Sequence, residues 1–437
     1  MSWQEYYQQR LLSADEASRK IQSGNRVLFG HAAAEPTVVK DAMLAHKDVY
    51  SDVEIVHMVS YGAMEYCRPG MEKHFRHNSI FASGHKTRAA FQEGRADFTP
   101  TYFSQVPALI KEDLLPIDVF ILQVAPPDKH GYVNLGTSID YGLAAVSKAG
   151  LVIAVVNEYM PHSMGSSFIP VSEFDYFVEH AAPLPELAPP AITNVEKQIG
   201  KHISSLIHDG DTLQLGIGSL PDAVLLFLKD KNDLGIHSEM ISDGVMHLMQ
   251  AGVVTNNKKT VFPGKAVVTF FAGSKVFYDF IDYNPAFQTM PADWVNNPYN
   301  IALNDNMVSI NSCVSVDFYG QVSSESIGKQ QISGVGGQVD FIRGANMSKN
   351  GRAVIAMAST TKNDGESKIM PFFGEGTPVT TNRFDSRYIV TEYGIAFMYG
   401  KTLRDRARAL IAISHPKFRP RLIEEWEKIF GAKYTEA

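Results

Sequence analysis

The sequence lacks the features that mark disulfide-rich, membrane-spanning or nucleic-acid-binding proteins. It has two cysteines in 437 residues, too few for a disulfide scaffold or a thiolate zinc site. Its longest apolar runs, at residues 151–156 and 223–228, are far shorter than the ~20 residues that cross a bilayer, and no signal peptide is visible at its start. The 40 Lys and Arg against 47 Asp and Glu give a net charge of −7, whereas binding of nucleic acid requires an excess of basic residues. We therefore expect a cytoplasmic protein with no membrane or nucleic-acid partner.

An internal repeat is present instead. The chain is too long for one ordinary domain, since domains average roughly 150 residues. Gly24 and Gly30 enclose a short apolar stretch, and Gly210 and Gly216 enclose another at the same spacing. Two more pairs of similar segments follow in the same order, at residues 119–134 and 308–323, and at residues 147–156 and 348–357. Ordered repetition of this kind predicts a duplicated α/β unit.

The apolar runs of the sequence predict the fold class. Short runs without polar alternation are typical of strands buried on both faces, in sheets that helices cover from both sides. Such runs occupy residues 27–29, 53–58, 119–124, 151–156, 212–215 and 353–357. Because helical segments separate them, we predict two related, open, mostly parallel α/β domains. Ligands of such sheets bind beyond the carboxyl ends of the strands.

A proline-rich segment at residues 181–190 divides the chain. Proline fixes φ and removes a backbone donor, which suits an extended linker. After it, residues 194–208 have the apolar spacing of an amphipathic helix. We therefore predict an N-terminal domain at residues 1–185 and a C-terminal domain at residues 186–437.

A glycine-rich turn follows the predicted strand at residues 212–215. Gly216 and Gly218 allow backbone amides to approach a bound group, Ser219 can cap the helix that follows, and a helix start favours anions such as phosphate. A tight turn with no ligand is the plain alternative. A nicotinamide-binding fingerprint requires a third glycine where Pro221 stands, so we do not expect a nicotinamide enzyme.

A second glycine cluster, Gly334-Val-Gly-Gly337, is the densest in the chain. Glycines destabilise regular structure, and their presence is understandable if amides must face a developing negative oxygen. A flexible loop is the alternative. His237 and Glu239 resemble half of a zinc-deaminase motif, but no cysteine pair completes it, and His74 and His77 have no nearby ligand set. We therefore expect no metal.

Four ordered motifs together resemble those of the acetyl-CoA hydrolase/transferase family of class I CoA-transferases, and in particular the 4-hydroxybutyrate and butyrate/acetate CoA-transferases. The resemblance spans essentially the whole chain and implies two facing, related α/β domains with the active site between them; the duplication agrees with the repeat. It also suggests a homodimer. The motifs begin at Gly216 (Gly-Ile-Gly-Ser-Leu-Pro), Ser238 (Ser-Glu-Met-Ile-Ser-Asp-Gly), Gly334 (Gly-Val-Gly-Gly-Gln-Val-Asp-Phe) and Thr391 (Thr-Glu-Tyr-Gly).

The resemblance implies roles for individual residues. Glu239 matches the carboxylate that becomes a glutamyl-CoA thioester, Gly337 an amide donor to the thioester oxygen, and Asn297 the asparagine beside the nucleophile. Glu392 matches a polar residue near the acyl pocket. No prosthetic group is implied, because CoA is a substrate that is held covalently for part of the cycle. The residues implied to contact CoA are Gly216, Ile217, Gly218, Ser219, Leu220, Ser333, Gly334, Gly337 and Lys362.

The expected reaction is a ping-pong transfer of CoA between short-chain carboxylic acids, with 4-hydroxybutyryl-CoA or butyryl-CoA and acetate as substrates. A carboxylate can displace the thiolate of a thioester, since that thiol has a pKa near 8.5. An acyl-CoA hydrolase using the same glutamate is one alternative, and a non-catalytic acyl-CoA-binding protein is another. Glu239 as a simple helix cap is the plain alternative. We expect the loops at residues 30–36 and 61–65 to line part of the acyl pocket.

Overall fold

The structure, a computed structural model, describes residues 1–82, 84–188 and 190–435. Pro189, part of the predicted linker, lies outside the described residues. Contacts divide the chain into two compact units. The first contains Met1–Ala188 and Val267–Val295, and the second contains the described residues of Pro189–Ala266 and Asn296–Ala437. The predicted boundary between residues 185 and 186 stays a prediction.

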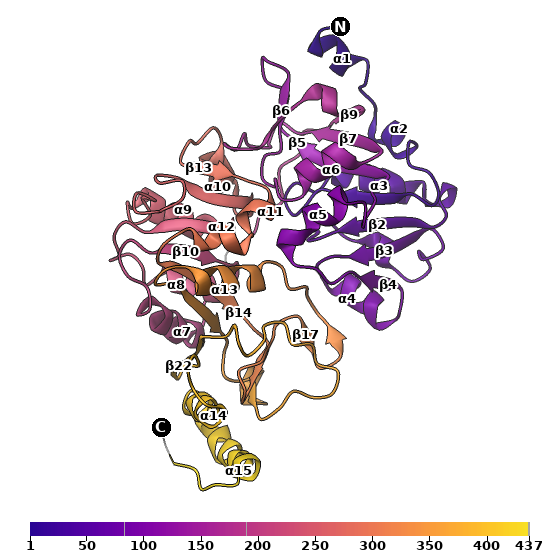
Figure 1. The fold of residues 1–437 in the computed structure, drawn as a ribbon. Helices are drawn as coiled ribbons and strands as arrows, with labels where there is room; N and C mark the ends of the chain where they lie inside the picture. Colours follow the sequence, from indigo (N-terminus) through magenta and orange to yellow (C-terminus); the bar gives the residue numbers. More distant parts are fainter. Residues whose placement is uncertain (83, 189, 436–437) are drawn as a thin grey trace. The chain divides into compact units, whose positions relative to one another are not determined.

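The first unit is built on a parallel sheet, coloured indigo to magenta in Figure 1. Its strands lie in the order β4-β3-β2-β1-β5-β7-β9, and every neighbouring pair is parallel. β6 (Tyr132–Asn134) and β8 (Phe168–Pro170) form a small antiparallel pair. The sheet strands are β1 (Arg26–Phe29), β2 (Val53–His57), β3 (Phe75–Ser79), β4 (Ala96–Phe98), β5 (Val119–Val124), β7 (Leu151–Val156) and β9 (Tyr176–Glu179).

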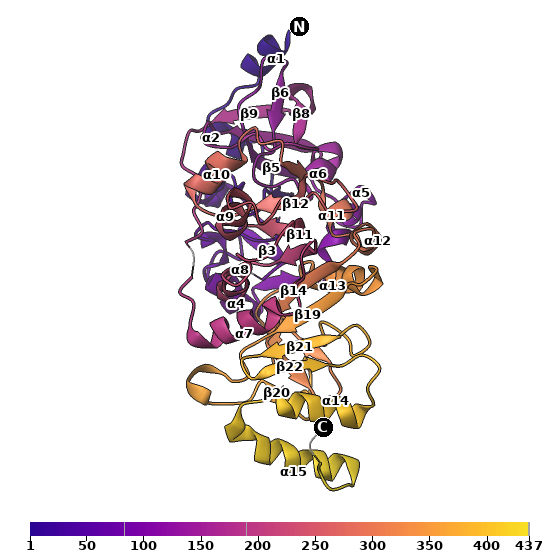
Figure 2. The same cartoon turned by 90° about the vertical axis from the view of Figure 1, so that its left-hand side faces the viewer.

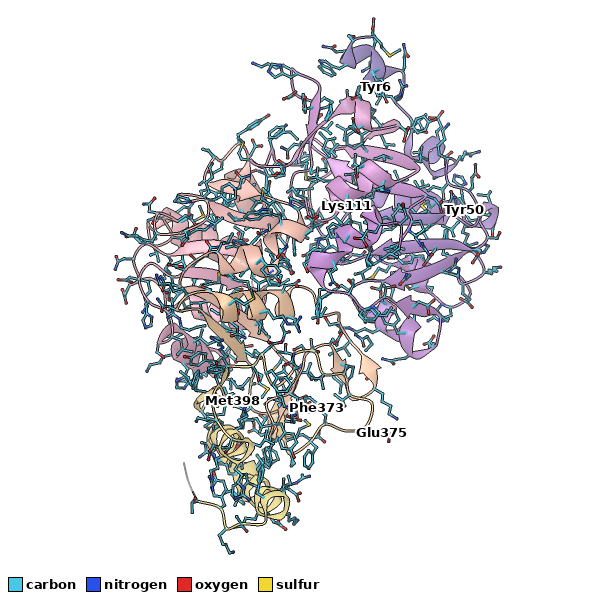
Figure 3. The ribbon with its side chains drawn as sticks, in the orientation of Figure 1. Tyr6, Tyr50, Lys111, Phe373, Glu375 and Met398 are labelled. Atoms are coloured by element: carbon cyan, nitrogen blue, oxygen red, sulfur yellow. The ribbon has the colours of Figure 1, made fainter. Side chains whose placement is uncertain are left out.

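Alternate side chains of these strands pack on opposite faces of the sheet, as β geometry requires. Val27 and Phe29 of β1 share one apolar core with Val39, which belongs to helix α3. Tyr50, labelled in Figure 3, joins this core, and its hydroxyl donates to the backbone oxygen of Ser18 at 2.7 Å. The helices are α1 (Trp3–Gln8), α2 (Ala14–Ser18), α3 (Thr37–Ala45), α4 (Gly84–Gln92), α5 (Val106–Lys111) and α6 (Gly142–Lys148).

A segment from later in the chain completes the first unit. Phe271 donates its backbone N–H to Thr137 at 2.8 Å, and Ile139 donates to Thr269 at 3.0 Å. These bonds attach residues 267–295 to the loop between β6 and α6. The segment's elements are β12 (Ala266–Phe271), α10 (Lys275–Ile281), β13 (Phe287–Thr289) and α11 (Ala292–Val295).

In the second unit, neighbouring strands lie in the order β11-β10-β14-β19-β21-β22. All these pairs are parallel except the last, which is antiparallel. Small sheets of β15, β16 and β20, and of β17 and β18, accompany them. The strands are β10 (Thr212–Leu215), β11 (Gly235–Ile241), β14 (Met307–Ser312), β15 (Ser315–Asp317), β16 (Val322–Ser323), β17 (Ser326–Ile327), β18 (Gln330–Gln331), β19 (Arg352–Ala356), β20 (Ile369–Met370), β21 (Tyr388–Thr391) and β22 (Gly394–Phe397).

Helices of the second unit connect these strands and end the chain. Figure 2 shows the last two side by side, and the indole N–H of Trp426 joins them by donating to the backbone oxygen of Arg404 at 3.1 Å. The helices are α7 (Asn194–Ser204), α8 (Ser219–Leu225), α9 (Asp243–Gln250), α12 (Pro298–Ala302), α13 (Gln338–Met347), α14 (Leu403–Ala412) and α15 (Arg419–Phe430).

The two units repeat one strand order, which confirms the predicted mostly parallel α/β class. β1 lies between β2 and β5, with β7 and β9 beyond, and β10 lies likewise between β11 and β14, with β19 and β21 beyond. The predicted helix at residues 194–208 is shorter than expected: α7 ends at Ser204, because residues 205–207 hydrogen-bond to the third residue before them. Within the described ranges, no helix has the length and apolarity needed to span a membrane.

Candidate functional site

Several of the residues predicted to be functional lie at or after the carboxyl ends of parallel strands of the second unit. The turn at residues 216–218 follows β10, Glu239 lies near the end of β11, Lys362 follows β19 and Glu392 follows β21. Because the carboxyl ends of parallel strands meet at one edge of a sheet, these positions share that edge, where open α/β sheets bind ligands.

Glu239 lies within strand β11. The next helix, α9, begins only at Asp243, so Glu239 caps no helix. Its neighbour Ser238 fixes this part of the strand, because the Ser238 hydroxyl donates to the backbone oxygens of Leu215 at 2.9 Å and Met240 at 2.7 Å. The strand therefore presents a half-buried carboxylate from a rigid position.

The carboxylate of Glu239 accepts a hydrogen bond from the side-chain amide of Asn296, with 2.7 Å between Nδ2 and Oε2. Asn296 is fully buried, and its Oδ1 has no hydrogen-bond partner in the described part of the chain. The Asn296 amide is therefore a buried donor to the carboxylate.

The asparagine beside Glu239 is one residue earlier than the sequence indicated. Asn297 is the N-cap of α12, and its Oδ1 accepts the backbone N–H of Tyr299 at 3.0 Å. Asn296 precedes the cap and points to Glu239. Asn297, expected beside the nucleophile, thus starts a helix, and the side chain that lies at the carboxylate is that of Asn296.

Gly337 approaches Glu239 more closely than any other residue type could. A Cβ atom built on Gly337 would overlap both Oε2 of Glu239 and Nδ2 of Asn296. Gly337 is also the N-cap of α13, which places the Glu239 carboxylate at the positive end of a ten-residue helix. The cluster at residues 334–337 is thus an ordered turn, and Gly336 in it has a φ of 54°.

The turn after β10 is also ordered. Gly218 has a φ of 112° and is the N-cap of α8, a conformation that favours glycine. Ser219 does not cap the helix as expected: it is the first helical residue, and its hydroxyl donates to Glu196 of α7. Ile217 is 44% exposed, and Leu220 is buried beneath the turn. The turn therefore offers an apolar side chain and a helix start to a ligand.

Glu392 and Lys362 belong to one hydrogen-bonded arrangement. The carboxylate of Glu392 accepts the backbone N–H of Ser359 at 2.9 Å and the Ser359 hydroxyl at 2.6 Å. Ser359 begins the turn that carries the exposed Lys362. Ser333, another residue expected to contact CoA, precedes the glycine cluster at residues 334–337. Its backbone N–H donates to the backbone oxygen of Glu325 at 3.1 Å. Both oxygens of Glu392 thus anchor the lysine turn.

The histidines of the discarded metal motifs lie in the cores of their units. Nδ1 of His237 lies 2.9 Å from Nδ2 of Asn304, and Nδ1 of His77 lies 3.0 Å from the backbone oxygen of Ile55. Burial lowers the pKa of His77 to about 3. Among the residues that the structure describes, no three His, Cys, Asp or Glu side chains are grouped as a metal site requires.

Comparison with known proteins gives concordant matches along the chain. Residues 1–186 match the acetyl-CoA hydrolase/transferase N-terminal domain, and residues 273–426 match the C-terminal domain of the same name. The chain is 57% identical to the 4-hydroxybutyrate coenzyme A transferase of Clostridium kluyveri over 430 residues, 98% of this chain and 100% of that protein. It is 36% identical to the butyryl-CoA:acetate CoA-transferase of Anaerostipes caccae, covering 98% of each.

A solved structure is similar throughout. The crystal structure of the 4-hydroxybutyrate CoA-transferase from Porphyromonas gingivalis superposes with a TM-score of 0.85 at 40% identity, over 98% of this chain and 100% of that one. The resemblance found in the four motifs is thereby confirmed over the full length.

Proposed function

Because this chain belongs to the acetyl-CoA hydrolase/transferase family and is an enzyme of the CoA-transferase class, we propose a specific reaction for it. In this reaction, CoA moves between short-chain carboxylic acids through a covalent intermediate on Glu239. The substrates we propose are 4-hydroxybutyryl-CoA or butyryl-CoA, with acetate as the second acid. Relatives named for these compounds support that choice.

The reaction takes place in two mirrored halves. A carboxylate oxygen of Glu239 attacks the thioester carbon of the acyl-CoA. The carbon–sulfur bond breaks, CoA departs as its thiolate, and an acyl-glutamyl anhydride remains. The thiolate then attacks the carboxyl carbon of Glu239, the first acid departs as its carboxylate, and a glutamyl-CoA thioester remains. An acceptor carboxylate reverses both steps. No net proton is gained or lost.

One observation carries this assignment: the Glu239 carboxylate lies against the Asn296 amide and the Gly337 backbone. During thiolate attack, negative charge develops on an oxygen of the Glu239 carboxyl group. A fixed amide donor and the N-terminus of α13 favour that charge, and preorganised donors of this kind are typically worth 100-fold or more in rate. Catalysis then requires little reorganisation of the site.

The remaining predicted residues bind CoA in this proposal. The turn at residues 216–220 provides a helix start and the side chain of Ile217. Ser333 and Gly334 directly precede the turn that brings Gly337 to Glu239. Lys362 provides a positive charge suited to phosphate. Binding energy from the distant parts of CoA can be used to bring the thioester carbon to Glu239. Glu392 acts indirectly, by holding the turn of Lys362 through Ser359.

Steady-state kinetics with two substrates test the proposal. With acetyl-CoA as donor and butyrate as acceptor, a covalent intermediate without a ternary complex gives parallel double-reciprocal lines, and butyryl-CoA forms as acetyl-CoA disappears. Release of free CoA at the same rate with and without butyrate would instead identify an acyl-CoA hydrolase. Binding of acetyl-CoA without either product would identify a non-catalytic binding protein.

A further inference from the structure

Helix α7 packs closely against α8, the helix that follows the turn at residues 216–218. A Cβ atom built on Gly200 of α7 would lie 2.7 Å from the backbone oxygen of Ala223 in α8. On the same helix, Ile199 and Ile203 are fully buried. Elements packed at this density leave no room for one helix to slide along the other. The position of α7 therefore determines that of α8.

A single carboxylate joins the starts of these two helices. Oε2 of Glu196 accepts the backbone N–H of Thr193 at 2.7 Å, which completes a capping box at the start of α7. Oε1 of Glu196 accepts the hydroxyl of Ser219, the first residue of α8. The capping box uses only one carboxylate oxygen, so the bond to Ser219 is one that the start of α7 does not require.

The Ser219 hydroxyl is committed to this bond as a donor. Burial by itself would raise the pKa of the Glu196 carboxyl group, but hydrogen bonds from Ser219 and Thr193 outweigh burial and lower that pKa. Glu196 is therefore ionised at neutral pH, and an ionised carboxylate only accepts. Hydrogen bonds to an ionised group are about twice as strong as those between neutral groups. The bond between Ser219 and Glu196 is thus a strong link between α8 and α7.

The turn before Ser219 has few other contacts that could hold it. Within the described part of the chain, a Cβ atom built on Gly218 would meet nothing within 4 Å, and one built on Gly216 would meet only Pro221, at 3.8 Å. Ile217 between them is 44% exposed. Glycines also give a backbone wide conformational freedom. The conformation of this turn therefore depends on its two ends, which are strand β10 and Ser219.

Helix α7 also reaches the second segment that CoA contacts in the proposed function. Nε2 of His202 donates to the backbone oxygen of Glu392 at 3.3 Å, and the side chain of Glu392 holds Ser359 at the start of the Lys362 turn. The helix directly before β1 in the first unit, α2, has five residues, whereas α7 has eleven. A sheet of this kind therefore does not by itself require a helix as long as α7.

We propose that Glu196 is a positioning residue for CoA binding: its bond to Ser219 holds the turn at residues 216–218 in the conformation that CoA contacts. This proposal rests on the proposed CoA transfer, which assigns the turn to CoA, and it adds a residue that does not itself touch the substrate. Without the bond, CoA has to order the turn as it binds, and its affinity falls by the cost of that ordering.

The test measures binding of CoA to the full-length protein by titration calorimetry, which needs no turnover. Glu196→Ala should raise the Kd of CoA about 10-fold, as expected for one hydrogen bond to a charged group. The KM for acetyl-CoA should rise by a similar factor, with a smaller change in kcat. Glu196→Gln keeps an acceptor oxygen for Ser219 and should recover most of the affinity. An unchanged Kd in Glu196→Ala would overturn the proposal.

A double-mutant cycle tests whether Glu196 acts through Ser219. Ser219→Ala leaves the capping box of α7 intact, so it removes the bond without disturbing the start of that helix. It should weaken CoA binding as much as Glu196→Ala does, and the variant with both changes should bind no more weakly than either. An unchanged affinity in Ser219→Ala, or additive losses in the double variant, would overturn the proposal.

Thr193→Ala is a matched control for the stability of α7. Its hydroxyl accepts the backbone N–H of Glu196 at 3.4 Å, and its removal weakens the capping box while both carboxylate oxygens of Glu196 keep their donors. Thr193→Ala should lower the midpoint of urea unfolding and leave the Kd of CoA unchanged. A loss of affinity equal to that in Glu196→Ala would show that helix stability determines CoA binding, which would contradict the proposal.

The outcomes also separate this proposal from the proposed function. Wild-type protein that binds CoA but transfers none between acids would overturn the proposed transfer, and the binding series would still decide the role of Glu196. Wild-type protein that transfers CoA, together with unchanged CoA affinity in Glu196→Ala, would overturn only the role of Glu196. Wild-type protein that binds no CoA would overturn both.

Discussion

The side-chain amide of Asn296 donates to the carboxylate of Glu239 across 2.7 Å, while the next residue, Asn297, caps a helix. Two adjacent residues of the same type therefore have different tasks. The pairing of Asn296 with Glu239 and the close approach of Gly337 define the part of the site where we expect bonds to form.

Asn296→Ala should lower kcat by about 100-fold, because it removes a fixed donor beside the reacting carboxylate. Asn297→Ala should instead destabilise α12 by about 1 kcal/mol through loss of its cap, with kcat close to that of the wild type. Initial rates and urea unfolding of both variants separate these effects. If Asn297→Ala loses as much activity as Asn296→Ala, the assignment of Asn296 is wrong.

Gly337→Ala should abolish most activity, because the new Cβ would overlap Oε2 of Glu239 and Nδ2 of Asn296. The control is Gly374→Ala, since the atom nearest to a Cβ there is 3.9 Å away. The control should retain wild-type rates. Thermal melting of both variants measures any loss of stability, and an active Gly337→Ala enzyme would show that the turn does not need its close approach.

Much of the fold was predictable because its signals are local. The runs at residues 119–124, 151–156 and 212–215 are strands with the expected bounds, since uninterrupted apolar residues specify a doubly covered strand. Gly337 was also identifiable, because clustered glycines are costly without a reason.

Other features depend on three-dimensional contacts or on backbone detail. The choice between Asn296 and Asn297 depends on where α12 begins, and both residues precede the same proline. The hydrogen bond of Ser219 to Glu196 joins positions 23 residues apart, and no periodicity connects them. For Glu392, the sequence could not reveal that both carboxylate oxygens are bound to Ser359.

Glu392→Ala should raise the KM for acyl-CoA about 10-fold with a smaller change in kcat, because it releases Ser359 and loosens the turn that carries Lys362. Lys362→Ala should act in the same direction. Glu375→Ala is the control, since that carboxylate, labelled in Figure 3, is on a side chain 95% exposed. A drop in kcat at unchanged KM in Glu392→Ala would place Glu392 at the reacting atoms instead.

Acid should destabilise the first unit through two buried histidines. Burial lowers the pKa of His57 and of His77 to about 3, against 6.5 for an exposed ring. Between these values the unfolded chain binds more protons than the folded one. The free energy of unfolding therefore falls as the pH drops from 6.5 towards 3, by about 1.4 kcal/mol per pH unit for each histidine.

His77→Gln cannot take up this proton, so its stability should fall less steeply with pH than that of the wild type. Urea unfolding at pH 7 and pH 5 measures the difference, with an expected gap of about 2 kcal/mol between the two pH-dependent losses. Parallel losses in both proteins would show that His77 is not a neutral, buried ring.

The central claim is that CoA becomes covalently attached to Glu239. Protein mixed with acetyl-CoA, quenched with acid and digested with trypsin contains the peptide spanning residues 232–258. Mass spectrometry should find that peptide heavier by one CoA less one water, with fragmentation placing the addition on Glu239. Borohydride added to the intact enzyme after acetyl-CoA should reduce the thioester and inactivate the enzyme. An unmodified peptide 232–258 from enzyme that is visibly exchanging CoA between acids would contradict the account.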